Sequence, residues 1–158
     1  MKKKILNIAI VGLGNIGSYL YKYLSTNKKI LSAKNNCIPN IVYVSAKNKN
    51  KKRNLTINKK KWLKNYLDAT KIKEVDIIIE LIGGAEGPAK KLVFEALKNK
   101  KHVVTANKEL IAKYGDQLSE IAEENKVNLE FEAAVCGGVP IIRSLKEGLI
   151  ANKIEKVY

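Results

Sequence analysis

A glycine-spaced turn near the N-terminus has the residue types and spacing that hold phosphate groups. The turn contains Gly12, Gly14 and Gly17 and directly follows an apolar run over residues 5–11. Residues 18–24 after it are typical of a helix. Gly12 permits a tight turn, Gly14 lets the backbone approach a pyrophosphate, and Gly17 lets helix and strand pack closely. Phosphates would lie at the positive end of the helix, where backbone N–H groups lack partners. This context predicts a dinucleotide site. The alternative is a glycine-rich turn that only packs.

The residues after the second predicted strand bear on which dinucleotide fits. That strand covers residues 41–46 and is followed by Lys47, with Lys51, Lys52 and Arg53 just beyond it. In a dinucleotide fold, an acidic residue here binds the adenosine ribose hydroxyls of NAD, whereas a basic residue accommodates the extra phosphate of NADP. Because this stretch is basic and holds no acid, NADP is favoured over NAD. The alternative is a solvated basic loop.

Lys108 is the second candidate for chemistry because it stands where a helix start disfavours it. If Thr105 caps the helix predicted over residues 107–125, Lys108 takes the position where a capping box has Glu or Gln. A positive charge there opposes the helix dipole by roughly 0.3–1 kcal/mol. Lys108 also follows the strand predicted over residues 102–105, at the sheet edge that binds ligands in open α/β folds. Its ammonium could polarise a carbonyl or bind a substrate oxygen. A plain surface lysine is the alternative.

Strands and helices must alternate along the chain to position these residues. Apolar runs predict five strands, over residues 5–11, 41–46, 75–82, 102–105 and 127–132. Helices are expected over residues 18–24, 62–67, 89–99, 107–125 and 140–150, and the start of a further strand over residues 153–158. Loops are expected over residues 27–40 and 47–60. This alternation predicts an α/β fold, a Rossmann-type doubly wound parallel sheet with right-handed crossovers.

Length and composition narrow the class of protein. The 158 residues suit a single well-buried domain. No apolar run approaches the roughly 18 residues of a membrane span, so we expect a cytoplasmic protein. Cys37 and Cys136 lack metal-ligand spacing, and His102 is the only histidine, which argues against a transition-metal site. No base is evident beside Cys136 that would make it a nucleophile.

The formal charge of +15 raises the question of a nucleic-acid partner, since lysines neutralise phosphates. The lysines are, however, spread along the chain as a general compositional bias would spread them. Their densest cluster, over residues 47–61, has no interleaved aromatic residues for stacking on bases. We therefore expect no nucleic-acid partner.

Three further motifs resemble the homoserine dehydrogenase family. They cover residues 79–84, 101–112 and 131–142, in that family's order and spacing. The resemblance runs from the first strand to about Tyr158 and implies reversible reduction of L-aspartate 4-semialdehyde to L-homoserine with NADPH or NADH. That reaction lies on the route to threonine, methionine and isoleucine. The resemblance also implies a small-molecule substrate, no membrane partner, and a homodimer for a full-length member.

The resemblance also implies roles for single residues. The pyrophosphate would lie on the turn of Leu13, Gly14, Asn15 and Ile16, between Gly12 and Gly17. Lys47 matches a position where the family often has an arginine for the 2′-phosphate of NADP. Thr105 and Lys108 match residues lining the nicotinamide and the active site, Lys108 as one of two lysines implicated in catalysis.

The loop over residues 132–139 resembles a sodium site of that family built largely from backbone carbonyls. The matching residues are Glu132, Val135, Gly137 and Val139. Hard oxygen donors suit such a cation, and glycines let the chain curl around it. A glycine hinge between domains is the alternative.

We expect two units along the chain. Residues 1–135 would form the dinucleotide-binding Rossmann domain, and residues 136–158 a hinge with the beginning of a truncated catalytic domain. Family members continue beyond the position of Tyr158 with the substrate-binding sheet, the second lysine and most dimer contacts. The chain alone is therefore expected to catalyse little, because hydride transfer needs substrate and nicotinamide held together. The alternative is a non-catalytic dinucleotide-binding module whose basic surface contacts an acidic partner.

Overall fold

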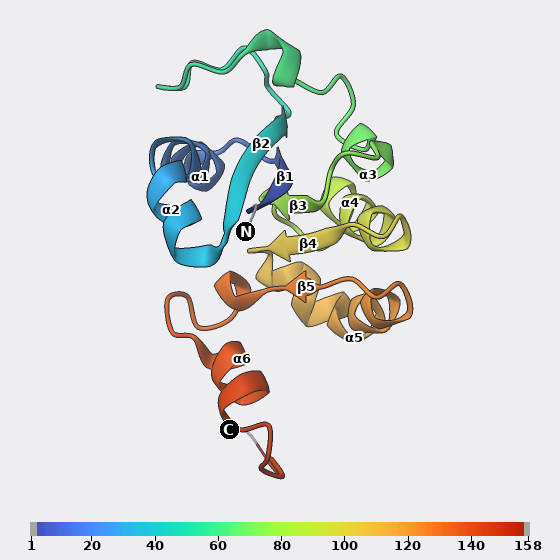
Figure 1. Ribbon diagram of the computed structural model, residues 1–158. Coiled ribbons are helices and arrows are strands. Elements are labelled where there is room, and N and C mark those ends of the chain that lie inside the picture. The colour runs from blue at the N-terminus through green and yellow to red at the C-terminus, as the bar shows by residue number, and fades with distance from the viewer. Residues whose placement is uncertain (1–2, 157–158) are drawn as a thin grey trace.

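A five-stranded parallel sheet forms the centre of the computed structural model, which describes residues 3–156 (Figure 1). Its strands are β1 (Lys4–Val11), β2 (Cys37–Ser45), β3 (Ile77–Glu80), β4 (His102–Thr105) and β5 (Leu129–Glu130). They lie in the order β2-β1-β3-β4-β5, and each neighbouring pair is parallel. The strand order reverses between β1 and β3, which is the switch point of a doubly wound sheet. The predicted Rossmann-type α/β fold is confirmed.

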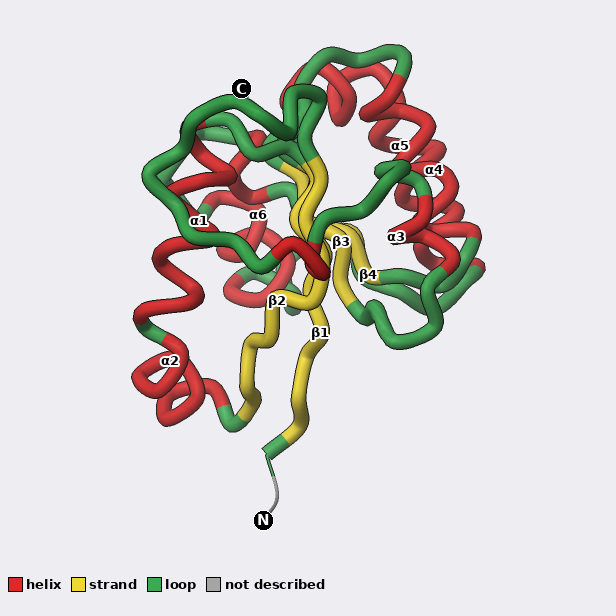
Figure 2. Tube along the Cα trace, turned by 90° about the horizontal axis from the view of Figure 1, so that it is seen from above, coloured by secondary structure: helices red, strands yellow, loops and turns green. Residues whose placement is uncertain are grey.

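Helices cover both faces of this sheet (Figure 2). On one face lie α1 (Asn15–Thr26) and α2 (Lys28–Asn35); on the other lie α3 (Asp68–Lys71), α4 (Pro88–Lys98) and α5 (Lys108–Glu124). Successive residues of β1 alternate between the two faces, as side chains of a strand must. Ile8 and Ile10 pack in the core that includes Tyr21 of α1, whereas Ala9 and Val11 pack in the core that includes Leu92 of α4. The sheet is therefore buried on both sides.

The segment predicted as a loop over residues 27–40 is instead α2 followed by the first residues of β2. This prediction was wrong because α2 is lysine-rich and all its side chains stay at least partly exposed, so no apolar stripe marks it. Strand β2 begins at Cys37 and includes Pro39. A proline is tolerated there because β2 is an edge strand.

The helix predicted over residues 62–67 is also absent from the described chain. A 3₁₀ turn (Lys59–Lys61) precedes this segment and α3 follows it. Between them Trp62 forms a bridge with Val44, and the N–H of Leu63 donates to the carbonyl of Val44 at 3.0 Å. Pairing with the edge of the sheet therefore replaces the helical hydrogen bonds of this stretch.

The last part of the chain is less regular than predicted. The helix expected over residues 140–150 consists of α6 (Ile141–Arg143) and a π-helical turn (Ser144–Gly148). Residues 153–156 are not in a strand, and residues 157–158 lie outside the described chain. In the part that is described, no helix has the length and apolar character to cross a membrane. The domain boundary after residue 135 stays a prediction.

Candidate functional site

The glycine turn lies where the ends of three strands meet. The N–H of Gly12 donates to the Ser45 carbonyl of β2 at 2.9 Å, and the N–H of Leu81 after β3 donates to the Val11 carbonyl of β1 at 2.8 Å. Gly12 has a φ of +109°, and a Cβ there would lie 2.4 Å from the Leu81 carbonyl. A Cβ on Gly17 would lie 2.0 Å from the Gly12 carbonyl oxygen. Packing therefore requires glycine at both positions.

Gly14 is glycine for a different reason. It is the N-cap of α1 with a φ of −75°, and a Cβ added to it would meet no described atom within 4 Å. Within the described residues no side chain caps this helix end, and its first turn holds no acidic residue. Unpaired N–H groups and the positive end of the helix dipole thus face open space. These features suit a bound phosphate.

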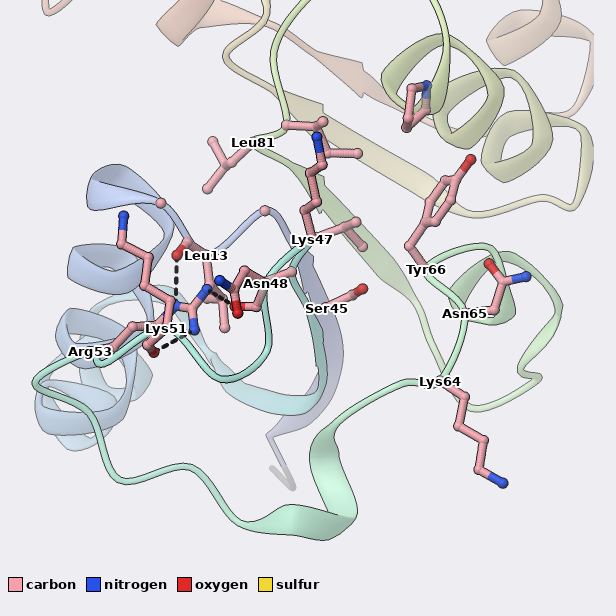
Figure 3. A pocket seen from close by; sticks show the side chains of 16 residues that line it. Leu13, Ser45, Lys47, Asn48, Lys51, Arg53, Lys64, Asn65, Tyr66 and Leu81 are labelled. Atoms are coloured by element: carbon pink, nitrogen blue, oxygen red, sulfur yellow. Dashed lines mark hydrogen bonds between the residues drawn. The ribbon is translucent and has the colours of Figure 1, made fainter.

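A cavity of about 760 Å³ opens beside this turn (Figure 3). Its walls come from the ends of β1, β2 and β3 and include Gly12, Leu13, Gly14, Ser45, Lys47, Asn48 and Leu81. Among the described residues that line it, none is acidic. Figure 3 shows Lys47 extending from the end of β2 toward Leu81. Within residues 3–156 the exposed Lys47 ammonium has no hydrogen-bond or ion-pair partner, which leaves it available to an anion.

Arg53 joins the loop after β2 to the glycine turn. Its Nε donates to the Leu13 carbonyl at 2.8 Å, and its other nitrogens donate to the carbonyls of Asn48 at 2.8 Å and Lys51 at 3.0 Å. The guanidinium also lies 5.7 Å from the ring centre of Trp62. The sequence marks Arg53 only as one of several basic residues, because the carbonyl that it reaches is 40 positions away.

At the ends of β3 and β4, a buried carboxylate organises the backbone. Glu80 is fully buried, and its Oε1 accepts the N–H groups of Ile82 at 2.6 Å and Gly83 at 3.1 Å. Its Oε2 accepts the Thr105 hydroxyl at 2.6 Å. Thr105 Oγ1 in turn accepts the N–H of Asn107 at 3.0 Å. Glu80 has no role among the residues predicted from the sequence, although a single acid that ends a strand of isoleucines is a visible signal.

Asn107, not Thr105, caps α5. Its Oδ1 accepts the N–H of Leu110 at 3.1 Å, and its amide donates to the Gly84 carbonyl at 2.8 Å. The predicted capping-box position of Lys108 is therefore wrong, because Lys108 is the first residue of the helix and Leu110 occupies the third position. Lys108 still places positive charge in the first turn. It is exposed, and no partner for its ammonium lies within the described residues.

The structure brings together only some of the residues singled out from the sequence. Gly12, Leu13, Gly14 and Lys47 line the main cavity, and Asn15 lines an adjoining cavity of about 360 Å³ beside the start of α1. Thr105 and Lys108 do not line either cavity; they lie at and just after the end of β4, next to β3 in the sheet. The geometry thus separates a half at the glycine turn and the end of β2 from a second half at β3 and β4.

Comparison with known proteins identifies the family. A family model described as "Homoserine dehydrogenase, NAD binding domain" matches residues 12–132. The chain belongs to the homoserine dehydrogenase family. It is 39% identical to the homoserine dehydrogenase of Bacillus subtilis (strain 168) over 154 residues, which are 98% of this chain and 35% of that protein. It is 38% identical to the homoserine dehydrogenase of Neisseria gonorrhoeae, again over 98% of this chain and 35% of that protein. The chain therefore spans about a third of these relatives.

Solved structures of the same family share this fold. The crystal structure of a homoserine dehydrogenase from Thiobacillus denitrificans has a TM-score of 0.86 and 39% identity, over 98% of this chain and 36% of that one. A hyperthermophilic archaeal homoserine dehydrogenase in complex with NADPH has a TM-score of 0.70 at 22% identity, over 93% of this chain and 50% of that one. At 22% identity, the comparison with the archaeal protein shows only that the two chains share a fold.

The loop proposed from the family resemblance as a sodium site is curled and internally bonded. Cys136 and Gly137 have φ values of +52° and +59°. The Glu132 carbonyl accepts the Val135 N–H at 3.1 Å, and the Val139 carbonyl accepts the Ile141 N–H at 2.8 Å. A carbonyl oxygen has two lone pairs, so both groups keep capacity for a cation. Within the described chain, no three His, Cys, Asp or Glu residues cluster as metal ligands.

The Glu132 carboxylate has a separate task in this loop. Its two oxygens accept the N–H groups of Ile142 and Arg143, each at 3.0 Å. These N–H groups lie in the first turn of α6 and have no acceptor within the helix, so the carboxylate caps that helix. The sequence resemblance assigned Glu132 to cation binding and missed this contact, because ten residues separate the partners.

An exposed ion cluster secures the loop between β3 and α4. Glu86 accepts hydrogen bonds from Lys113 of α5 at 2.6 Å and from the Tyr114 hydroxyl. The Lys113 hydrogen bond, then that of Tyr114, lowers the pKa of Glu86 to about 2. Lys90 lies 3.4 Å from the same carboxylate and 4.0 Å from the Tyr114 ring centre. The glycine-rich loop after β3 is thereby tied to α5.

Proposed function

We propose that this chain is the nucleotide-binding part of a homoserine dehydrogenase, which interconverts L-aspartate 4-semialdehyde and L-homoserine with a nicotinamide cofactor. The observation that carries the proposal is Gly14, which has no side chain and so leaves the uncapped start of α1 open to the main cavity. None of the described residues that line this cavity is acidic. A pyrophosphate fits those N–H groups and that dipole. When bound, the cofactor supplies or accepts the hydride.

We assign the remaining tasks of the site to two lysines. Lys47, at the carboxyl end of β2, would bind the 2′-phosphate, so NADP is favoured and NAD is the weaker ligand. A carboxylate at this position would instead repel that phosphate dianion. Lys108, beyond the end of β4, would bind the carbonyl oxygen of the substrate and stabilise the negative charge that develops on it. Its ammonium is available because no described group pairs with it.

We also propose that the loop over residues 132–139 binds a monovalent cation, preferably Na⁺. The support is its curled backbone and the four carbonyl groups of Glu132, Val135, Gly137 and Val139. We expect a higher melting temperature in NaCl than in choline chloride at equal ionic strength, because a ligand that binds the native state stabilises it. Equal melting temperatures would remove the cation from the proposal.

The test of nucleotide binding is a titration of the chain with NADPH and with NADH, followed by nicotinamide fluorescence. We expect both to bind, NADPH more tightly. Gly14→Ala should weaken both ligands by about tenfold or more, because the new methyl group occupies the place of the phosphate. Its φ of −75° suits alanine, so the fold should persist. Gly148→Ala is the matched control, since a Cβ there also meets open space. If neither nucleotide binds the unaltered chain, the proposal fails.

A further inference from the structure

Glu80 breaks the pattern of the strand that it ends. The three residues before it in β3 are isoleucines, and Glu80 itself has no exposed surface. Burying a carboxylate is strongly unfavourable unless hydrogen bonds replace its water. Three donors do so here: two backbone N–H groups of the loop after β3 and the hydroxyl of Thr105. An apolar residue would fill this place without that requirement, so the carboxylate has a local purpose.

The hydrogen bonds of Glu80 belong to a closed ring that joins two strand ends. From the carboxylate, one arm holds the N–H groups of Ile82 and Gly83. The other arm runs through the Thr105 hydroxyl to Asn107, whose side-chain amide returns to the carbonyl of Gly84. Gly83 and Gly84 have φ values of +85° and +79°. Because glycine adopts many backbone conformations, contacts with other residues are needed to keep the loop in this one. The ring fixes this loop relative to the end of β4.

The ring lies on the opposite side of the switch point from the phosphate-binding lysine. In a doubly wound sheet, a dinucleotide crosses the carboxyl edge where the strand order reverses, here between β1 and β3. Lys47 follows β2, so the adenosine half belongs over β1 and β2, and the nicotinamide half belongs over β3 and β4. Asn107 also caps α5 and directly precedes Lys108.

We infer, on the basis of the proposed function, that Glu80 is a positioning residue for the nicotinamide half of the cofactor and for Lys108. Its carboxylate holds the loop over residues 82–84 and, through Thr105 and Asn107, the first turn of α5. Glu80 does not contact cofactor or substrate in this assignment. It fixes the backbone that must be in place before the nicotinamide is bound productively.

The test separates the two halves of the cofactor in the full 158-residue chain. Glu80→Gln keeps one acceptor oxygen and replaces the other by an amide NH2 group, so the side chain cannot accept from the loop N–H groups and from the Thr105 hydroxyl at the same time. We expect the Kd of NADPH to rise by about tenfold, with a loss of the blue shift of nicotinamide fluorescence, because a buried charged hydrogen bond is lost. Adenosine 2′,5′-bisphosphate, which lacks the nicotinamide half, should bind with an unchanged Kd.

Two further variants keep the test decisive. Glu74→Gln removes a carboxylate in the turn before β3, where it accepts the Tyr43 hydroxyl, and should leave both ligands bound as before. Thr105→Val preserves side-chain shape and breaks the same ring from β4, so it should reproduce the selective loss of NADPH even if Glu80→Gln does not fold. Folding is followed by thermal melting.

Two results would overturn the inference. One is unchanged NADPH binding in Glu80→Gln and Thr105→Val; the other is an equal loss of NADPH and the bisphosphate in folded protein, which would mean that the ring only supports the site as a whole. Failure of the unaltered chain to bind NADPH would instead overturn the proposed function, and the inference with it.

Discussion

At the scale of single residues, Lys47 should determine how strongly the chain distinguishes the two nicotinamide cofactors. Its ammonium lies at the cavity wall without a partner in the described chain, and the cofactors differ by one phosphate. We expect Lys47→Ala to weaken NADPH by about tenfold and to leave NADH nearly unchanged, because a charge-assisted hydrogen bond to the phosphate is lost. Paired titrations at one salt concentration measure this ratio.

Lys60→Ala is the control for this prediction. It removes the same charge from the basic segment, but Lys60 belongs to the 3₁₀ turn and does not line the cavity. Long-range attraction of an anionic ligand should therefore change equally in both variants. An equal effect of Lys47→Ala on NADPH and NADH would show that the phosphate lies elsewhere.

How much of the site was predictable depends on how far apart its partners are in the sequence. Gly12, Gly14 and Gly17 were predictable because the strand, turn and helix that explain them are contiguous. The contacts of Glu80 with Thr105 and of Arg53 with Leu13 were not predictable, because these partners lie 25 and 40 positions away and only the fold brings them together. From residue type alone, a charged side chain that has a distant partner cannot be distinguished from one that is exposed to solvent.

At the scale of elements, the same distinction explains which strands and helices could be predicted. The apolar run of β1 identifies a buried strand by itself, since both faces of the sheet are covered. The segment around Trp62 forms no helix because the edge of β2 offers it a bridge partner, which no local pattern reveals. The capping role of Asn107 was likewise assigned to Thr105, because either side chain can cap a helix and only the geometry chooses.

The loop after β2 should lose its order when Arg53 is replaced by lysine. Lysine keeps the charge but lacks the planar group that reaches Leu13, Asn48 and Lys51 at once. We therefore expect amide hydrogen exchange over residues 47–53 to accelerate by about tenfold, with little change in β1 or α4. Arg143→Lys is the matched control, because that guanidinium pairs with exposed Glu147, outside this loop. Unaltered exchange in Arg53→Lys would contradict the assignment.

The loop between β3 and α4 should make part of the stability depend on pH. The hydrogen bonds of Lys113 and Tyr114 lower the pKa of Glu86 from 4.5 to about 2, so the folded state favours the ionised carboxylate. This contribution is fully present above pH 4.5 and is lost as the pH falls toward 2. In urea unfolding between these limits, the unaltered chain should lose stability faster than Glu86→Gln. Parallel curves would show that the cluster adds nothing, as for many exposed ion pairs.

At the scale of the whole molecule, the charge distribution favours anionic ligands over the sheet edge. The chain has thirty basic and fifteen acidic residues. Among the described residues that line the main cavity, four have positively charged side chains and none has a negatively charged one. A field of one sign focused in a cleft raises the rate at which an oppositely charged ligand arrives. The basic composition that first suggested a nucleic-acid partner is thus also compatible with a dinucleotide.

The length of the chain relative to its relatives leads to a prediction about turnover. It spans 35% of the Bacillus subtilis homoserine dehydrogenase, and its described residues provide a candidate phosphate site and one candidate substrate lysine, Lys108. Hydride transfer requires the substrate to be held against the nicotinamide, and a misplacement of about 1 Å is enough to lose most of the rate. We therefore expect these 158 residues to bind NADPH without oxidising homoserine.

The measurement is nicotinamide absorbance with saturating NADP and homoserine, with the Bacillus subtilis enzyme as the active control under the same conditions. The nucleotide titration is run on the same sample, so that a lack of turnover is separated from a lack of binding. NADPH binding together with no homoserine-dependent absorbance change is the expected result. Homoserine oxidation by the chain itself would mean that the groups around Lys108 and the ends of β3 and β4 suffice to hold the substrate.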